Sequence, residues 1–126
     1  MSKTYLDLEI YKEAMALFGE THHLSYALPK SETYELGTQV RRSCDSNATN
    51  IMEGYGRRRY KTEFVRSLTY SHASSLETTC HLEKISLAYP DLKGKAVLLL
   101  EPHVILSRKI HKFIAYMEAN WMTRRL

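Results

Sequence analysis

The chain has 126 residues, of which 44% are hydrophobic and 25% are charged. These values are ordinary for one globular domain and argue against a largely disordered chain. The longest strongly apolar run, Ala96–Leu100, is far shorter than the roughly 20 residues of a membrane span, so no membrane association is expected. Two cysteines without a metal-binding spacing, Cys44 and Cys80, and a start without the apolar segment of a signal peptide favour a reduced, cytoplasmic protein.

The net charge of +4 is concentrated in one short segment. Residues 1–56 carry five basic and eight acidic side chains, and residues 67–126 carry eight and five. Residues 57–66 carry five basic side chains and one acidic side chain. Clustered positive charge attracts polyanions. The segment therefore predicts an anionic partner, with a charged turn that only keeps the protein soluble as the alternative.

The first predicted helix covers about residues 6–26 and has two apolar stripes. Leu8, Tyr11, Met15 and Phe18 follow the 3-4 spacing of a helix face and are expected to face the core. A second stripe lies on the opposite side by the 3.6-residue period; it comprises Leu6, Ile10, Leu17, Leu24 and Leu28. Because a helix of a lone bundle normally has one apolar face, the second stripe predicts a contact between subunits. A wide core with a few exposed leucines is the alternative.

The second predicted helix covers about residues 32–55 and ends at the glycine signal Gly54–Gly56. Its expected inward line is Leu36, Val40, Asn47, Ile51 and Gly54. Small and apolar residues beside this line predict a surface that another helix approaches closely. We therefore expect an oligomer interface formed by Leu6, Ile10, Leu17, Leu24, Cys44, Ala48 and Met52.

The opposite flank of the second helix is polar, with six side chains within about 80° of one another. They are Glu35, Gln39, Arg42, Ser46, Asn50 and Glu53. An arginine with acids and amides one turn away can form a satisfied hydrogen-bond network. Such a network more often fixes helix packing than performs chemistry, so a structural role is predicted.

The third helix is expected over about residues 62–88 and the fourth over about 92–124, separated by Tyr89-Pro90. Pro102 lies inside the fourth helix, where we expect either a kink near Leu98 or a restart of the helix. Four long helices with short connections predict an all-α fold, an antiparallel up-down-up-down four-helix bundle, with residues 1–126 as one domain.

Motifs for catalysis are sparse. A di-iron bundle needs two Glu-x-x-His motifs, and only Glu20-x-x-His23 is present, so no metal or other cofactor is expected. Cys44 and Cys80 are expected to act as small apolar residues. Arg66 and His72 resemble the Arg-x4-6-His motif of HEPN ribonucleases, in which histidine transfers protons and arginine stabilises a phosphate. The main expectation is a protein without enzymatic activity in which His72 is a buried core residue.

A combination of motifs in the second helix resembles a known family. Leu36-Gly-Thr-Gln39-Val-Arg41-Arg42-Ser43 is followed by Ser46-Asn47-Ala48-Thr49-Asn50-Ile51-Met52-Glu53-Gly54. Over roughly residues 8–89 the chain thus resembles the four-helix-bundle proteins encoded in intervening sequences of bacterial 23S ribosomal RNA genes. The resemblance implies a ring, commonly a homopentamer, without catalytic activity. Related accessory variability proteins of diversity-generating retroelements bind a reverse transcriptase and nucleic acid through a basic surface.

Together these features predict a homo-oligomeric bundle that binds RNA or DNA with little sequence preference. Phosphate contacts are assigned to Arg41, Arg57, Arg58, Arg59 and Lys61, base stacking to Tyr55 and Tyr60, and further contacts to Arg124 and Arg125. A scaffold that binds only a protein partner is the first alternative, and a ribonuclease using Arg66 and His72 is the second.

Overall fold

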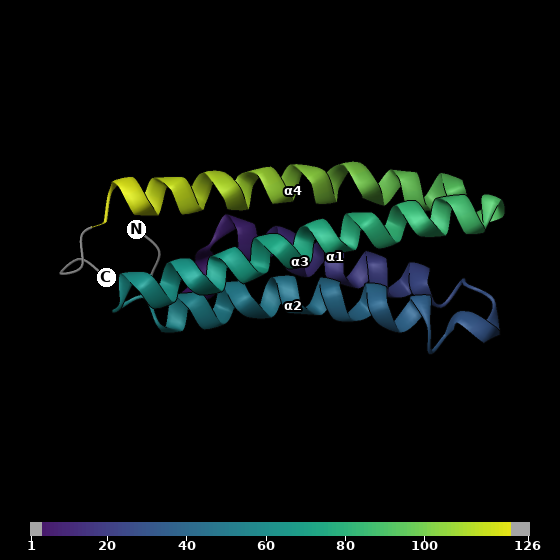
Figure 1. Cartoon of the computed structure of the whole chain (residues 1–126), viewed down its shortest axis with the longest axis horizontal. Coiled ribbons are helices and arrows are strands. Elements are labelled where there is room, and N and C mark those ends of the chain that lie inside the picture. The colour runs from purple at the N-terminus through teal and green to yellow at the C-terminus, as the bar shows by residue number, and fades with distance from the viewer. Residues whose placement is uncertain (1–3, 122–126) are drawn as a thin grey trace.

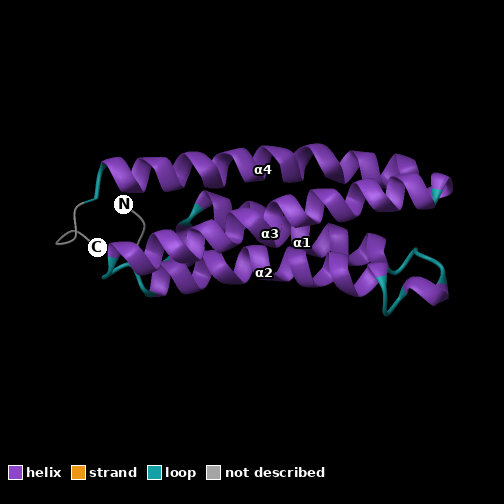
Figure 2. Ribbon diagram, viewed as in Figure 1, coloured by secondary structure: helices purple, strands orange, loops and turns teal. Residues whose placement is uncertain are grey.

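The computed structural model of the protein describes residues 4–121 and consists of helices joined by short connections (Figure 1). The four α-helices are α1 (Glu9–Ser25), α2 (Leu36–Gly56), α3 (Lys61–Ala88) and α4 (Lys93–Ala119). Three short 3-10 helices occupy Tyr5–Asp7, Lys30–Glu32 and Pro90–Leu92. Within this range no residue lies in a strand (Figure 2). The expected all-α fold of four helices is confirmed, and none of the described helices is long and apolar enough to cross a membrane.

Polar contacts between the helices define their directions. Asn47 of α2 accepts a hydrogen bond from Ser71 of α3 at 2.7 Å, and Ser43 bonds to Thr78 at 2.8 Å. Residue numbers fall along α2 as they rise along α3, so these two helices are antiparallel. α1 and α4 are related in the same way through the pairs Glu13–Lys109 and Thr21–His103. In Figure 1 the helices lie lengthwise, with α4 along one edge and α2 along the other.

The helix boundaries differ from the prediction mainly at the starts of α1 and α2. α1 begins at Glu9 because the chain before it forms a 3-10 helix, and α2 begins at Leu36 because a second 3-10 helix and a turn precede it. α4 ends at Ala119. The part of the fourth helix that was expected beyond residue 121 lies outside the described residues.

Pro102 does not restart the fourth helix, since α4 is continuous from Lys93 to Ala119. A proline inside a helix removes the hydrogen bond to the carbonyl four residues earlier, here that of Leu98. Leu98 is largely exposed, so water can satisfy its carbonyl. This exposure lowers the free-energy cost of placing a proline inside the helix.

The core consists of two apolar clusters separated by a polar layer. The first cluster centres on Ile51, Phe64, Leu68 and Ile110, and the second on Val40, Leu82 and Ile85. Between them, buried hydroxyl, amide and imidazole groups from all four helices bond to one another: Thr21 with His103, Ser43 with Thr78, Asn47 with Ser71, and Ser75 with Ser107. Because each pair is matched, the layer specifies the register of the four helices.

Two groups of this polar layer have strongly shifted pKa values. His103 is fully buried, and its burial lowers the pKa of the imidazole to about 4, so the ring is neutral at pH 7. Cys44 lies beside Thr21, and burial raises the pKa of its thiol to about 11. A thiol held in the protonated form is a poor nucleophile, so Cys44 acts as the small apolar residue that was predicted, but it does so in the core of a single chain.

Within α1 the two apolar stripes face the opposite way from the prediction, although Leu8, just before the helix, is buried as expected. Ile10, Leu17 and Leu24 are at most 7% exposed and belong to the core of a single chain, whereas Met15 is 45% exposed. In α2, the side chains of Cys44 and Ala48 are buried as well. The assignment of these five buried residues to an oligomer interface is therefore wrong. Helical spacing identifies which residues share a face, but it does not decide which face turns inward.

Only two of the seven expected interface residues keep surface area that a second chain could contact. Leu6 is 56% exposed, and Met52 is half-buried. Met52 lies beside Met15 and the half-buried Phe18, in a groove of about 170 Å³ between α1 and α2. The outward apolar surface of these helices thus combines Met52 with Tyr11, Met15 and Phe18, which were expected to face the core.

Candidate nucleic-acid interface

The basic segment forms the tight connection between α2 and α3. α2 ends at Gly56, and the backbone N–H of Arg57 donates to the carbonyls of Glu53 and Gly54. Tyr60 N–H donates to the carbonyl of Arg57 at 3.0 Å, and α3 begins at Lys61. These bonds satisfy backbone groups that a helix end leaves without partners. The connection therefore presents consecutive basic side chains at one end of the bundle on an ordered backbone.

Gly54 allows α2 and α3 to converge just before this turn. A Cβ atom at this position would lie 2.9 Å from Cβ of Ser67 and 3.3 Å from the ring of Phe64. Cβ of Ser67 is attached directly to the backbone of α3, so it cannot move aside without moving the helix. Gly54, which was expected on the inward line of the second helix, therefore lets α3 of the same chain approach closely.

The turn holds Arg57 and Arg58 differently. The guanidinium of Arg57 lies 3.9 Å from the carboxylate of Glu53 in an exposed ion pair, which is worth little in water. Arg58 stacks over the ring of Tyr55 at 4.0 Å from the ring centroid and donates to the Tyr55 carbonyl at 2.9 Å. Tyr55 is only 8% exposed. Its expected role in stacking on a base is therefore wrong, because its ring is buried.

The remaining side chains of the turn face solvent. Arg59 is exposed, and within residues 4–121 it makes neither an ion pair nor a side-chain hydrogen bond. Tyr60 is 62% exposed, so one face of its ring is open to a flat ligand. Lys61 is exposed and donates to the backbone carbonyl of Glu118, near the end of α4, at 3.2 Å. The open cationic surface thus consists of Arg57, Arg59 and Lys61, with Tyr60 between the last two.

Arg41 is not part of this surface. It lies 16 residues before Arg57 on the same helix, which separates the two by about 24 Å. Its guanidinium donates to Ser25 Oγ at 3.0 Å and to the carbonyl of Thr33 at 2.8 Å, and it stacks over the ring of Tyr26. The expected phosphate contact of Arg41 is wrong, because its donors hold the connection between α1 and α2. Arg124 and Arg125 lie outside the described residues.

The polar flank of α2 forms a smaller network than expected. Asn50 donates to the backbone carbonyl of Ser46 at 2.9 Å and to its hydroxyl at 3.0 Å, and Ser74 of α3 donates to the same hydroxyl at 2.9 Å. Glu53 faces the turn, where it pairs with Arg57. The other three members are exposed: Glu35, Gln39 and Arg42. In the part of the chain that the structure describes, Arg42 has no ion pair, so it does not organise a network.

The residues weighed for catalysis do not converge. His72 is half-buried and lies in a groove between α3 and α4, 5.5 Å from the ring centre of His111. It is therefore not the core histidine that was expected. Arg66 lines a different groove and pairs with Glu63 at 3.4 Å. Since six residues on a helix rotate a side chain by about 240°, Arg66 and His72 do not form one site. Among residues 4–121 no three potential metal-binding side chains lie together.

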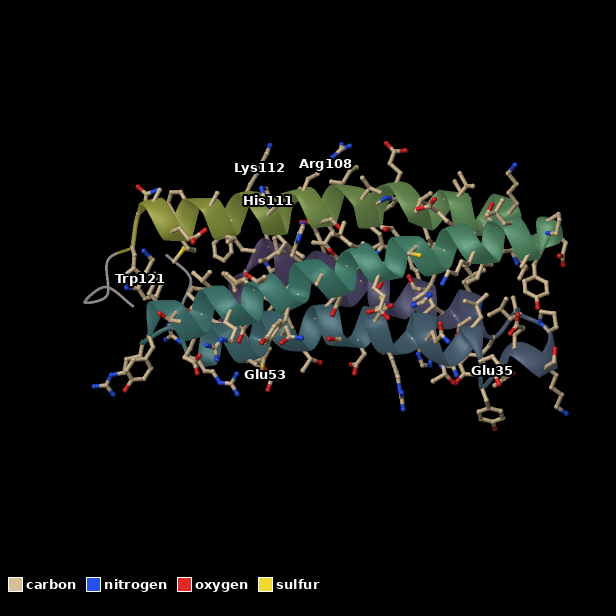
Figure 3. The ribbon with its side chains drawn as sticks, viewed as in Figure 1. Glu35, Glu53, Arg108, His111, Lys112 and Trp121 are labelled. Atoms are coloured by element: carbon tan, nitrogen blue, oxygen red, sulfur yellow. The ribbon has the colours of Figure 1, made fainter. Side chains whose placement is uncertain are left out.

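The cationic groups of α4 were not among the predicted site residues. Arg108, His111 and Lys112 line the groove that contains His72. Figure 3 shows these three side chains on α4, on the side of the bundle opposite to Glu35 and Glu53 of α2. Their spacing of three and four residues places them on neighbouring turns of one helix face. This spacing is visible in the sequence. The contact of His111 with His72 is not, because it depends on the packing of α3 against α4.

The fold and the turn define the class of the protein, a bundle of four helices with a cationic connection between the second and third. The chain belongs to the 23S rRNA-intervening sequence protein family, whose family model matches residues 6–89. The match includes α1, α2, the basic turn and α3, and it confirms the family resemblance expected from the motifs of α2. No curated protein shows significant similarity to the chain.

Proposed function

We propose that this protein is a non-enzymatic, homo-oligomeric bundle that binds RNA or DNA through the turn between α2 and α3. The observation that carries the proposal is the group of exposed cations in the turn, with Arg57 and Arg59 beside Lys61 and an open tyrosine ring among them. Arginine and lysine bind phosphate oxygens, and an exposed tyrosine stacks on a base. The turn thus provides both contacts needed to hold a nucleic-acid strand.

The composition of the turn favours binding with little sequence preference. Contacts to phosphates position a nucleic acid without reading its sequence. Direct reading of adenine commonly uses asparagine or glutamine, and residues 57–66 contain neither. Stacking on Tyr60 is available to every base, because each base has an aromatic face. We therefore expect similar affinities for unrelated sequences of equal length and structure.

One chain offers few phosphate contacts, so assembly of several chains is part of the proposal. The groove between α1 and α2, which contains Tyr11, Met15, Phe18 and Met52, is the surface that we assign to self-association. Family resemblance supports a ring, commonly a pentamer. Several turns on one assembly would add their weak contacts as avidity. The two thiols among the described residues, Cys44 and Cys80, are unpaired, which supports a reducing compartment such as the cytoplasm.

Light scattering tests the assembly. Met15→Glu combined with Met52→Glu places two charges in the groove between α1 and α2 and should reduce the mass to that of a single chain. Ala73→Glu, at an exposed position of α3, is the control and should leave the mass unchanged. An unchanged mass for the double variant would remove this groove from the interface.

Fluorescence anisotropy with labelled structured RNA and duplex DNA tests the nucleic-acid binding. With about four phosphate contacts, affinity for duplex DNA should fall about 10²-fold between roughly 50 and 200 mM salt. Arg57→Ala combined with Arg59→Ala should weaken binding and lower the salt slope by about two. Arg58 is left in place because it packs on Tyr55.

The matched control is Lys93→Ala combined with Lys95→Ala, because both lysines are exposed at the start of α4, at the opposite end of the bundle (Figure 1). The control has the same net charge as the turn variant and should bind as the wild type does. Equal binding by the turn variant and the wild type would overturn the proposal. An intact oligomer that binds no nucleic acid at low salt would instead be a protein scaffold.

A further inference from the structure

α3 and α4 enclose a groove on the outside of the bundle, separate from the basic turn. Its volume is about 320 Å³, and it is lined by His72, Leu76, Val104, Ser107, Arg108, His111 and Lys112. Leu76 and Val104 provide apolar walls. Arg108 and Lys112 extend outward from α4, with His111 between them in sequence (Figure 3). Four of the seven lining side chains can therefore carry a positive charge, and none is a carboxylate.

The two permanent cations of the groove lack neutralising partners on their own helix. Side chains three or four residues apart are neighbours on a helix. For Arg108 these positions are Val104, Ile105, His111 and Lys112, and for Lys112 they add Lys109, Ala115 and Tyr116. None is acidic. The positive charge of this face is therefore available to a ligand.

The carboxylates of the neighbouring helix segments either pair with other side chains or lie away from the groove. On α3, Glu63 pairs with Arg66 at 3.4 Å, and Glu77 lies 3.2 Å from His81. On α4, Glu101 lies seven residues before Arg108, about 10 Å along the helix, and Glu118 lines the neighbouring groove with Lys61 and Arg66. From α1, Glu13 pairs with Lys109 on another side of α4. No acidic group from the packed helices compensates the two histidines.

We propose that the groove between α3 and α4 is a second phosphate-binding site, in which His72, His111, Arg108 and Lys112 bind a backbone phosphate of the nucleic acid more tightly as the pH falls. This inference rests on the function proposed above. It adds a site that the basic turn does not include, and it gives binding a dependence on pH.

The geometry of the histidine pair explains the direction of the pH dependence. The ring centres are 5.5 Å apart, so protonation of one imidazole disfavours protonation of the other. Burial lowers the pKa of His72, and the charge of His111 lowers it further. A phosphate bound against the edges of the two rings favours their charged forms and opposes the lowering of the His72 pKa. Phosphate binding therefore favours protonation of the imidazoles, and their protonation increases the affinity for phosphate, below about pH 6.5, the ordinary pKa of histidine.

The same groups argue against a metal ion. Two imidazoles can hold a transition metal, but no third ligating side chain lies with them among the described residues. Arg108 and Lys112 would also repel a divalent cation. Anions are attracted by all four groups.

Continuity with the basic turn favours nucleic acid as the source of the phosphate. A second groove section of about 450 Å³, lined by Lys61, Thr62, Val65, Arg66 and Glu118, lies between the same two helices next to the turn. Val65, which lines this section, precedes His72 by seven residues, which places it about 10 Å away along α3 on nearly the same helix face. Cationic groups therefore extend from the turn along the α3–α4 side of the bundle. A nucleic-acid strand that binds through several of its phosphates requires such a continuous cationic surface.

Two measurements test this site. In the first, inorganic phosphate is titrated while NMR follows the imidazole pKa values of the intact protein. Phosphate should raise the pKa of His72 and shift the imidazole resonances of His111, and it should leave the resonances of His23, which is exposed on α1, in place. Arg108→Gln combined with Lys112→Gln should abolish the response while both histidines remain. Absence of a response in the wild type would overturn the site, whether or not the basic turn binds nucleic acid.

In the second, anisotropy measures the affinity for a labelled oligouridylate at about pH 5.8 and about pH 7.8. The wild type should bind about fivefold more tightly at the lower pH, because two half-unit rises in pKa give about tenfold only at a pH well below both values. His72→Gln combined with His111→Gln should reduce the ratio below about twofold, whereas His23→Gln should retain it. Circular dichroism at both pH values checks that each variant is folded.

The outcomes separate this inference from the proposed function. Arg57→Ala combined with Arg59→Ala should weaken binding at both pH values and keep the ratio between them. A wild-type affinity that does not change with pH would overturn the assignment to nucleic acid, even if free phosphate binds. An unchanged ratio in His72→Gln/His111→Gln would also overturn it, whereas an effect of the turn variant bears only on the proposed function.

Discussion

The two ends of α2 both carry arginines and use them in opposite ways. Near its start, Arg41 donates to Ser25 and Thr33 and stacks over Tyr26. At its end, Arg59 faces solvent without a partner among the described residues. The connection before α2 spans ten residues, 26–35, and brings a carbonyl and a ring to Arg41, while Ser25 at the end of α1 adds a hydroxyl. The connection after α2 spans only residues 57–60, and much of its backbone is used in closing the turn.

The comparison shows that an arginine stabilises the fold where neighbouring segments bring acceptors to its guanidinium, and that it remains available to a ligand where they do not. The connection before α2 brings such acceptors to Arg41, and the connection after α2 brings none to Arg59 among the described residues. Arg58 is intermediate, because it packs on Tyr55 but stays partly exposed. If this is correct, variants at the start of α2 should change stability, and variants at its end should change binding.

The largest effect on stability is expected between the two ends, in the polar layer. The folded-state pKa of His103 is about 4, against an ordinary value of 6.5. Between these values the unfolded chain binds a proton that the folded chain does not bind, so stability is lost as the pH falls from about 6.5 to 4. The loss attributable to His103 is on the order of 3 kcal/mol.

Urea unfolding of the wild type and of His103→Gln at several pH values measures this loss. Glutamine can still bond to Thr21 but does not titrate, so the variant should show a shallower decline with acidification. His23→Gln is the control because His23 is exposed. Parallel pH profiles for wild type and His103→Gln would show that the buried imidazole does not control acid stability.

The next effect tests the start of α2. Arg41→Ala removes the hydrogen bonds to Ser25, Thr33 and Thr38 and the contact with Tyr26, and should cost about 2 kcal/mol of unfolding free energy. Nucleic-acid affinity should not change, because Arg41 is remote from the turn. Denaturant unfolding and anisotropy on the same preparation measure both quantities. Weaker binding by a fully folded Arg41→Ala protein would remove the distinction between the two ends.

A smaller effect tests what positions the turn. Gly54→Ala places a Cβ atom 2.9 Å from Cβ of Ser67, and separating α2 from α3 should cost about 1–2 kcal/mol. Gly19→Ala is the matched control, since α1 has open space at that position. It should stabilise the protein by about 0.5–1 kcal/mol through helix propensity. Thermal unfolding compares the two, and stabilisation by Gly54→Ala would show that the helices do not need this close approach.

The smallest effects distinguish neighbouring arginines within the turn. Arg58→Ala removes the stacking on Tyr55 and the bond to its carbonyl, and should cost about 1 kcal/mol of stability. Arg59→Ala should cost less than about 0.5 kcal/mol, yet weaken nucleic-acid binding at low salt. Urea unfolding and anisotropy measure each variant. The reverse order of stability losses would show that packing does not separate the two side chains.

The motifs of α2 were sufficient to identify the family, and the periodicity of apolar residues was sufficient to locate four helices. The interface residues Ile10, Leu17 and Leu24 were misplaced, because an apolar stripe looks the same whether it packs within a chain or between chains. The roles of Arg41 and Tyr55 were misjudged because their partners lie on other segments or depend on the turn. The contact between His72 and His111 joins residues from two helices, so no pattern within one segment predicts it.

The amino-acid sequence by itself determined the helical architecture, the family and the position of the basic turn, because each depends on local spacing, glycine and proline positions and a continuous run of charge. Only the tertiary structure decided which face of α1 turns inward, which arginines are used in packing, and that α3 and α4 bring two histidines beside two free cations. These are properties of side chains brought together from separate helices, and their burial and electrostatic surroundings exist only once the bundle is packed.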